Sequence, residues 1–317
     1  MIFKGLDKEF LEGLKDKDNP LHFILEFEHK NRKSFIVEIR KNFLDLYFLG
    51  HGIEVKHKKR GNQYCLIASK YFNPKELLKT TPKTIVKPYG DKRWQIGFDE
   101  IENYDWFKEI MSAVLAQIAR HRNGSISEGV SEVNHLIDNR AVNKNGVLVI
   151  DRQVVYPGSR KNKMDLLGLR RLPSGKYTFS VIELKNKNNK EIEDVFTRQL
   201  IRYIDVVYDK YDDFVETYAN VLKQKVSLGL LKAVDIAIAT KNEIEKRDIE
   251  GIIILDNYNI RSDLRPDGLL NRALRDWGKV GSEYTARLFL KTNILDSTFF
   301  LDRPRAEEIL NRFKASN

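Results

Sequence analysis

The spacing of apolar residues changes near residue 100, and this change divides the chain into two parts. Before it, five short runs alternate apolar with polar side chains and are separated by Asn, Lys and Gly clusters. This pattern is typical of an antiparallel β meander. The runs cover residues 22–28, 34–40, 43–49, 52–58 and 64–72. We therefore expect a β-rich N-terminal domain over 1–100 that serves recognition or dimerisation.

Two further segments belong to this first part. Residues 6–15 predict a short helix. The segment 73–100 predicts a connector, because proline and glycine interrupt regular structure. These residues are Pro74, Pro82, Pro88 and Gly90.

The second part, 101–317, begins with a helical period. Trp106, Ile110, Val114 and Ile118 recur on one helical face. The expected elements are helices over 106–122, 127–140 and 191–210, and strands over 147–156, 163–172, 176–185 and 251–255. Helix, three strands, helix and strand in this order predict an α/β or α+β module with a mixed sheet flanked by helices.

Composition limits the environment of the chain. Its 317 residues are 42% hydrophobic, and no apolar run approaches the roughly 20 residues that cross a membrane. The N-terminal segment has no apolar stretch of the secretory kind. The single cysteine, Cys65, excludes an internal disulfide and lies in a strand-like run. We expect a cytoplasmic protein without membrane partners.

The charge of the chain suits a polyanionic partner. The formal net charge is +10, and the excess is spread along the chain rather than gathered in a tail. Such a balance favours nucleic acid as a partner, although charge alone does not decide it.

The hairpin expected around Pro173, Ser174 and Gly175 brings three chemically active residues together. A turn centred on Ser174 places Asp165 directly across from Glu183. Glu183 and Lys185 share a face because side chains alternate along a strand. A two-residue loop would instead turn Asp165 to the opposite face.

Two carboxylates held side by side attract a hard divalent cation such as Mg²⁺ or Mn²⁺. A lysine beside that cation can orient or deprotonate an attacking water. The other interpretation is a solvated strand face, with Asp165 as a turn or cap residue.

The helix expected after Lys185 carries a glutamine on its apolar stripe. The stripe consists of Ile192, Val195, Phe196, Tyr203, Val206 and Val207. Gln199 lies on it, four residues before Tyr203. A buried amide needs a partner, which the site could supply. A glutamine at the edge of the stripe, bonded to backbone, is the alternative.

The upstream helix offers a third carboxylate. Glu128 and Glu132 are four residues apart and share a face. Glu128 lies close to the start of the helix and suits a role at the helix dipole. Glu132 is therefore our choice for the site, with Glu128 as its rival.

These elements together resemble the PD-(D/E)xK nuclease superfamily. Asp165, the pair Glu183 and Lys185, and the pair Gln199 and Tyr203 follow its order, the last pair in the form seen in RecB-like nucleases. The strings RQLIRYIDVV and GIIIL look similar to mismatch endonucleases and Shedu-type defence nucleases. The resemblance covers about residues 125–256 and implies a restriction-endonuclease-like core, a divalent metal and phosphodiester hydrolysis.

The substrate expected for such a site is DNA rather than RNA. Basic residues flank the candidate site and would contact phosphates without reading sequence. They are Arg160, Lys161, Lys163, Lys187 and Lys190. Defence against foreign DNA, restriction or repair follows from the resemblance alone, and a homodimer is one expected assembly. The alternative is a nucleic-acid-binding or complex-assembly protein that keeps the fold without catalysis.

Overall fold

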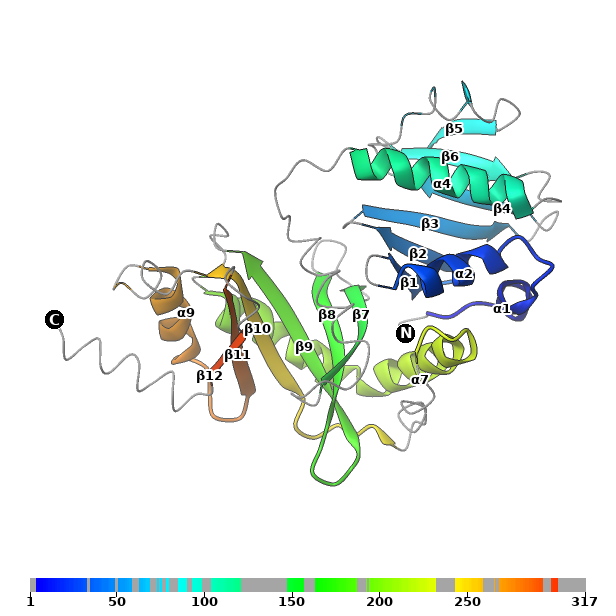
Figure 1. Ribbon diagram of the computed structural model, residues 1–317. Coiled ribbons are helices and arrows are strands. Elements are labelled where there is room, and N and C mark those ends of the chain that lie inside the picture. Colours follow the sequence, from blue (N-terminus) through cyan, green and yellow to red (C-terminus); the bar gives the residue numbers. More distant parts are fainter. Residues whose placement is uncertain are drawn as a thin grey trace. The chain divides into compact units, whose positions relative to one another are not determined.

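The computed structural model describes most of the two expected parts (Figure 1). The described residues are 4–32, 35–48, 51–58, 63–68, 85–89, 93–98, 104–120, 147–156, 163–186, 194–231, 243–258, 268–292 and 298–301, with single residues at 73, 75, 78, 79, 192 and 265. The chain forms two compact units. The first comprises Met1–Asp138 and Glu216–Ala239, and the second comprises Asn139–Val215 and Thr240–Asn317.

The first unit contains an antiparallel sheet of six strands in the order β1-β2-β3-β4-β6-β5. The strands are β1 (Phe35–Ile39), β2 (Phe43–Phe48), β3 (His51–Lys58), β4 (Gln63–Ala68), β5 (Ile85–Tyr89) and β6 (Arg93–Phe98). Leu44, Val55, Leu66 and Ile96 pair across neighbouring strands and are fully buried. The antiparallel pairing of consecutive strands confirms the expected meander for β1 to β4.

Among the described residues, four named helices belong wholly or partly to the first unit. They are α1 (Lys8–Lys15), α2 (His22–Lys30), α4 (Tyr104–Arg120) and the C-terminal part of α7 (Tyr211–Ser227). The ring of Phe27 in α2 meets Phe35 in β1 edge-on, with centroids 4.9 Å apart. Lys225 in α7 and Glu38 in β1 form a buried ion pair of 2.7 Å. The first unit thus extends past the boundary that we expected near residue 100.

Two expectations about the first part are wrong. Residues 22–28 form helix α2 rather than a strand, because Phe23 and Phe27 also recur at helical spacing and their rings lie 5.7 Å apart. The supposed connector 73–100 contains strands β5 and β6. Pro88 is compatible with β5 because β5 is an edge strand, the position in a sheet where proline is tolerated.

The second unit contains a mixed sheet in the order β12-β11-β10-β9-β8-β7. Its strands are β7 (Val147–Val155), β8 (Lys163–Arg171), β9 (Tyr177–Asn186), β10 (Glu250–Tyr258), β11 (Thr285–Thr292) and β12 (Thr298–Leu301). The first three form an antiparallel meander, whereas β10 runs parallel to both β9 and β11. This arrangement confirms the mixed α and β class and the three consecutive strands.

The hairpin between β8 and β9 has the register that we expected. Leu167 pairs with Val181 and Leu166 with Ile182, so the turn is centred on Ser174. Gly175 adopts a φ of +86°, which favours glycine, and its N–H donates to the carbonyl of Leu172 over 2.9 Å. The turn therefore sets which face each later residue of the hairpin occupies.

A helical segment follows β9, but it is not the single regular helix expected over 191–210. A π-helical turn, η2 (Val195–Leu200), leads into α6 (Ile201–Asp209). π-Helical turns inside helices are rare and often occur at functional sites. Ile192, Val195, Phe196, Tyr203 and Val207 of the predicted stripe are buried. The apolar stripe is thus confirmed, while the local backbone geometry differs.

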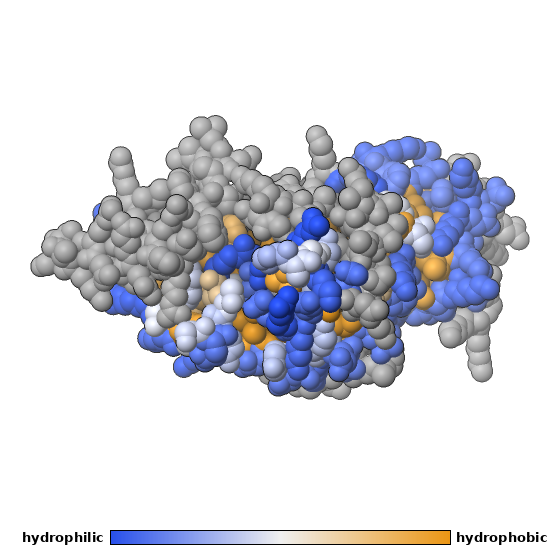
Figure 2. All heavy atoms as spheres, turned by 90° about the horizontal axis from the view of Figure 1, so that it is seen from below, coloured by the Kyte–Doolittle hydropathy of each residue, from blue (hydrophilic) through white to orange (hydrophobic). Residues whose placement is uncertain are grey.

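Few large hydrophobic side chains of the described residues are exposed. On the face seen in Figure 2, apolar atoms lie in small separate areas among hydrophilic ones. Leu78, Val155 and Tyr208 are the large hydrophobic residues of the described part that are exposed. No helix within the described ranges is both long enough and apolar enough to span a membrane.

Candidate active site

The core of the candidate site lies on one face of the β8–β9 pair. Continuing the register by one residue beyond Leu166 and Ile182 places Asp165 across from Glu183. The Leu184 amide donates a hydrogen bond of 2.9 Å to Oδ2 of Asp165, so the aspartate is held by the strand that carries Glu183. The structure therefore brings Asp165 and Glu183 to neighbouring positions.

Glu183 and Lys185 share this face, as their two-residue spacing predicts. Nζ of Lys185 donates to Oε1 of Glu183 over 2.8 Å, and the exposed fractions of the two residues are 3% and 2%. Removing two charges from water costs free energy that their mutual attraction offsets only in good geometry. This pair is therefore a charged group held in the interior, not a solvated strand face.

The helical segment η2–α6 covers the same face of the sheet. A Cβ on Gly251 would lie 2.5 Å from Leu200 and 3.0 Å from Ile204. Gly251 pairs with Val181 in β9, two residues before Glu183. The absence of a side chain at Gly251 thus allows the helix to approach the strands that carry the two carboxylates.

Tyr203 of α6 lies close to both carboxylates. Burial, together with the negative charges of Glu183 and Asp165, raises the pKa of the Tyr203 phenol to about 12, against the lowering influence of Arg202. The Arg202 guanidinium lies over the Tyr203 ring, 5.1 Å from its centroid. The ring of Tyr156, just after β7, meets that of Tyr203 edge-on at 6.3 Å. The phenol therefore stays protonated near neutral pH and can donate a hydrogen bond.

Gln199 lies in η2, four residues before Tyr203, as the sequence indicates. It is half-buried, and its Oε1 atom is inaccessible to solvent. Because η2 is π-helical, the angle about the helix axis between Gln199 and Tyr203 differs from the angle between two positions four residues apart in a regular α-helix.

Asp276 of α9 (Leu269–Trp277) fixes the start of η2, and the sequence did not point to it. Its Oδ2 accepts hydrogen bonds from the amides of Phe196 and Thr197, at 2.8 and 3.1 Å, and its Oδ1 accepts one from the Thr197 hydroxyl at 2.7 Å. The neighbouring Trp277 stacks on Phe196 with centroids 5.2 Å apart. A residue 80 positions away thus caps the helix that carries Gln199.

The oxygen atoms of Asp165 and Glu183 are of the kind that Mg²⁺ and Mn²⁺ prefer. Within the described ranges, no group of three or more Asp, Glu, His or Cys residues is arranged to hold a metal ion. Two carboxylates on one face fit a site whose other positions are filled by water and substrate oxygens. The donor set is therefore compatible with a hard cation.

Several expected site residues lie outside the described residues. They are Glu132, its rival Glu128, and the basic residues Arg160, Lys161, Lys187 and Lys190. Lys163 is described and is exposed at the first position of β8, two residues before Asp165. The choice between Glu132 and Glu128 stays a prediction.

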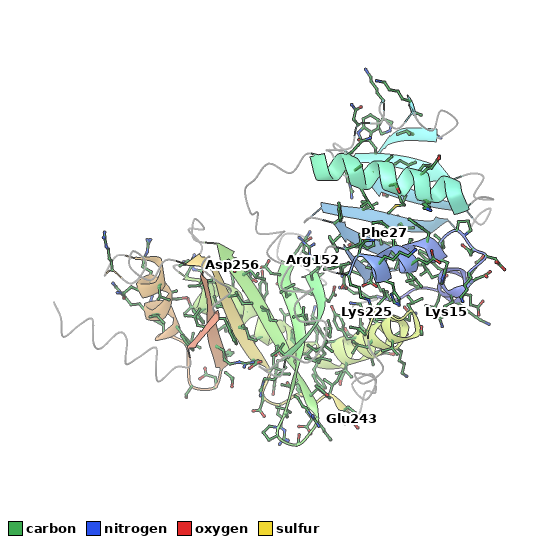
Figure 3. The ribbon with its side chains drawn as sticks, in the orientation of Figure 1. Lys15, Phe27, Arg152, Lys225, Glu243 and Asp256 are labelled. Atoms are coloured by element: carbon green, nitrogen blue, oxygen red, sulfur yellow. The ribbon has the colours of Figure 1, made fainter. Side chains whose placement is uncertain are left out.

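The site lies toward one end of the second unit's sheet. Asn186, just after Lys185, pairs with Asp256, and Arg152 pairs with Leu166 next to Asp165. Figure 3 shows Arg152 and Asp256 toward this end and Glu243 near the hairpin at the other.

Comparison with protein-family models finds no match to the chain, and comparisons with curated proteins and with solved structures find none either.

Proposed function

We propose that the chain is a Mg²⁺-dependent nuclease of the PD-(D/E)xK type that hydrolyses phosphodiester bonds in DNA. The observation that carries the proposal is the shared face of Asp165, Glu183 and Lys185, covered by the helix that bears Tyr203. An antiparallel meander followed by a parallel strand supports it further, since a restriction-endonuclease-like core has this arrangement.

The proposed roles follow from chemistry and burial. Asp165 and Glu183 would hold the cation, with Glu132 as the third carboxylate. A divalent cation bound there would lower the pKa of a bound water and offset charge on the phosphate. Lys185 would donate a hydrogen bond to the attacking water or to a phosphate oxygen, because its ammonium group is already fixed beside Glu183. Gln199 and Tyr203 would support the site or contact the nucleic-acid backbone.

The net charge of +10 and the exposed Lys163, two residues before Asp165, support a nucleic-acid substrate. The remaining basic residues expected around the site are Arg160, Lys161, Lys187 and Lys190. We place the protein in the cytoplasm because its single cysteine suits a reducing compartment. Recognition or homodimerisation is the proposed role of the N-terminal sheet.

A cleavage panel tests the proposal. Purified protein is incubated with supercoiled plasmid, linear duplex, single-stranded and branched DNA, and RNA, in Mg²⁺ or in EDTA. We expect Mg²⁺-dependent cleavage of at least one DNA form and none in EDTA. Cleavage of RNA alone would correct the substrate, and cleavage of nothing would overturn the proposal.

One observation favours a second candidate, a nucleic-acid-binding or complex-assembly protein without catalysis. Glu183 and Lys185 are almost fully buried and paired with each other, which also suits a purely structural ion pair. This candidate predicts DNA binding that neither Mg²⁺ nor EDTA changes, with no cleavage in any arm of the panel.

A further inference from the structure

Gln153 of β7 is a strained residue beside the candidate site, and no motif of the sequence points to it. Gln153 adopts a φ of +48°, in the left-handed region that residues other than glycine rarely occupy. The pairs on either side, Arg152 with Leu166 and Val154 with Met164, have the same register. No residue is therefore inserted at this point, and Gln153 lies directly across from Asp165.

Gln153 and Asp165 consequently share one face of the sheet. Asp151 of β7 pairs with Leu167 of β8, and Leu167 pairs with Val181 of β9, so these three residues lie on one face of the sheet. Glu183 lies on the same face, because it follows Val181 by two residues. Asp165 precedes Leu167 by two residues in β8 and so shares that face, and Gln153 lies across from Asp165. Gln153, Asp165 and Glu183 thus follow one another across three adjacent strands.

Exposure on this face rises toward the end of β7. Glu183 and Asp151 are buried, whereas Asp165 and Gln153 are half-buried. Val155, two residues further along, is 43% exposed and pairs with the exposed Lys163. Gln153 therefore lies beside Asp165 on the more exposed part of this face.

The backbone conformation makes the choice of residue informative. Glycine and asparagine tolerate left-handed φ angles better than glutamine does, so this position costs conformational free energy. Such strain persists where the surrounding structure imposes it, often at functional sites. A neutral amide next to Asp165 can donate a hydrogen bond to an anion without adding a charge that competes for the cation.

We propose that Gln153 is a substrate-binding residue whose side-chain amide donates a hydrogen bond to a phosphate oxygen of the nucleic acid held at Asp165. This inference rests on the proposed function and adds a residue to it. Asp151 is not an equivalent candidate, because it is buried and its Oδ1 accepts a hydrogen bond from the Arg152 amide over 2.8 Å.

Three variants separate substrate contact from strain. Gln153→Ala removes the amide and keeps a Cβ, Gln153→Gly removes the amide and relieves the strain, and Gln153→Asn tolerates the conformation and keeps a shorter amide. Asp248→Gly is the matched control, because Asp248 has a φ of +58° and is exposed before the start of β10. Thermal unfolding, the kcat and KM of DNA cleavage in Mg²⁺, and DNA binding in Ca²⁺ are measured for each.

We expect Gln153→Ala and Gln153→Gly to weaken DNA binding and lower kcat/KM by about 10-fold, the effect of one hydrogen bond to a charged group. Gln153→Asn should recover part of this loss, and Gln153→Gly should unfold at or above the wild-type temperature. Asp248→Gly should leave cleavage and binding unchanged.

The outcomes separate the role of Gln153 from the assignment of the protein as a nuclease. Wild-type cleavage with unchanged binding and kcat/KM in both amide-free variants would overturn the role of Gln153 and leave the nuclease assignment intact. A wild type that binds DNA without cleaving it would overturn the nuclease assignment, and the binding of the variants would still decide the role of Gln153. A wild type that neither binds nor cleaves would overturn both.

Discussion

Oδ2 of Asp165 in β8 accepts a hydrogen bond from the backbone amide of Leu184 in β9, at 2.9 Å. One side chain thereby joins the two strands that carry the candidate carboxylates. The same group has a structural role and a proposed chemical one, and substitutions at Asp165 can separate the two.

Asp165→Asn keeps an oxygen that can accept from Leu184, whereas Asp165→Ala does not. We expect Asp165→Asn to retain most of the folding stability and Asp165→Ala to lose about 1 kcal/mol. Both should lower cleavage by roughly 100-fold or more, because neither supplies a charged ligand. Urea unfolding and single-turnover cleavage measure the two effects. Equal activity of Asp165→Asn and wild type would assign Asp165 a structural role only.

Removing one member of the buried pair should destabilise the second unit strongly. Lys185→Met leaves the Glu183 carboxylate buried without its cation and should cost about 3–5 kcal/mol. The double variant Glu183→Gln/Lys185→Met should recover much of that loss, because no buried charge then lacks an opposite charge.

A double-mutant cycle from urea unfolding measures the coupling between Glu183 and Lys185. Additive losses would show that the two charges do not stabilise each other. The same unfolding data give the folded fraction of each single variant. The activity measured for that variant must be corrected for its unfolded fraction.

The pKa of Tyr203 predicts a pH dependence of stability. Its phenol has a folded-state pKa of about 12, raised mainly by burial and then by Glu183. A raised pKa means that the folded state holds the proton more tightly, so this contribution is complete below the ordinary value of 10. It is lost as the pH rises from 10 toward 12.

Tyr203→Phe should therefore lose less stability than wild type over this alkaline range. Glu183→Gln should lower the pKa of Tyr203, since it removes a negative charge near the phenol. Difference absorbance titrations between each protein and its Tyr203→Phe counterpart isolate this phenol from the other tyrosines. An unchanged pKa in Glu183→Gln would place Tyr203 outside the influence of the site.

The close approach of η2–α6 to the sheet gives a fourth prediction. Gly251→Ala puts a Cβ 2.5 Å from the Leu200 side chain, so this side chain and the helix that carries it must give way, at a cost of about 1–3 kcal/mol. Gly278→Ala is the control, because its nearest contact is an ordinary 3.4 Å and its φ of −59° suits alanine.

We expect the Gly251 variant to lose both stability and cleavage, since the displaced helix carries Gln199 and Tyr203. The Gly278 variant should change neither by a comparable amount. Thermal unfolding and the cleavage assay measure both, and equal behaviour of the two variants would contradict the helix position.

Local patterns predicted the parts of the site that depend on neighbours in sequence. The turn at Pro173, Ser174 and Gly175 determines the register of its own hairpin, and strand alternation determines the common face of Glu183 and Lys185. These relations follow from backbone geometry, so the residues alone sufficed.

The features that were missed depend on distant contacts or on ambiguous spacing. Asp276 caps η2 from 80 residues away, and the strained φ of Gln153 has no local sequence signal. Residues 22–28 fit both a strand and a helix, and packing of Phe27 on Phe35 accompanies the helical form. Pro88 suggested a connector because proline usually interrupts a strand. Its position at the edge of the sheet, where proline is tolerated, depends on tertiary structure and cannot be read from the local sequence.

The dependence of DNA cleavage on Mg²⁺ in wild type and Asp165→Asn tests the proposed role of Asp165 as a metal ligand most directly. The two proteins are first matched for folded fraction, and single-turnover rates on the best DNA substrate are then measured over a Mg²⁺ series that ends in EDTA. We expect wild-type cleavage to rise with Mg²⁺ and to be abolished by EDTA, and Asp165→Asn to stay at least roughly 100-fold slower. Equal rates for the two proteins, or wild-type cleavage that persists in EDTA, would contradict the proposed metal site.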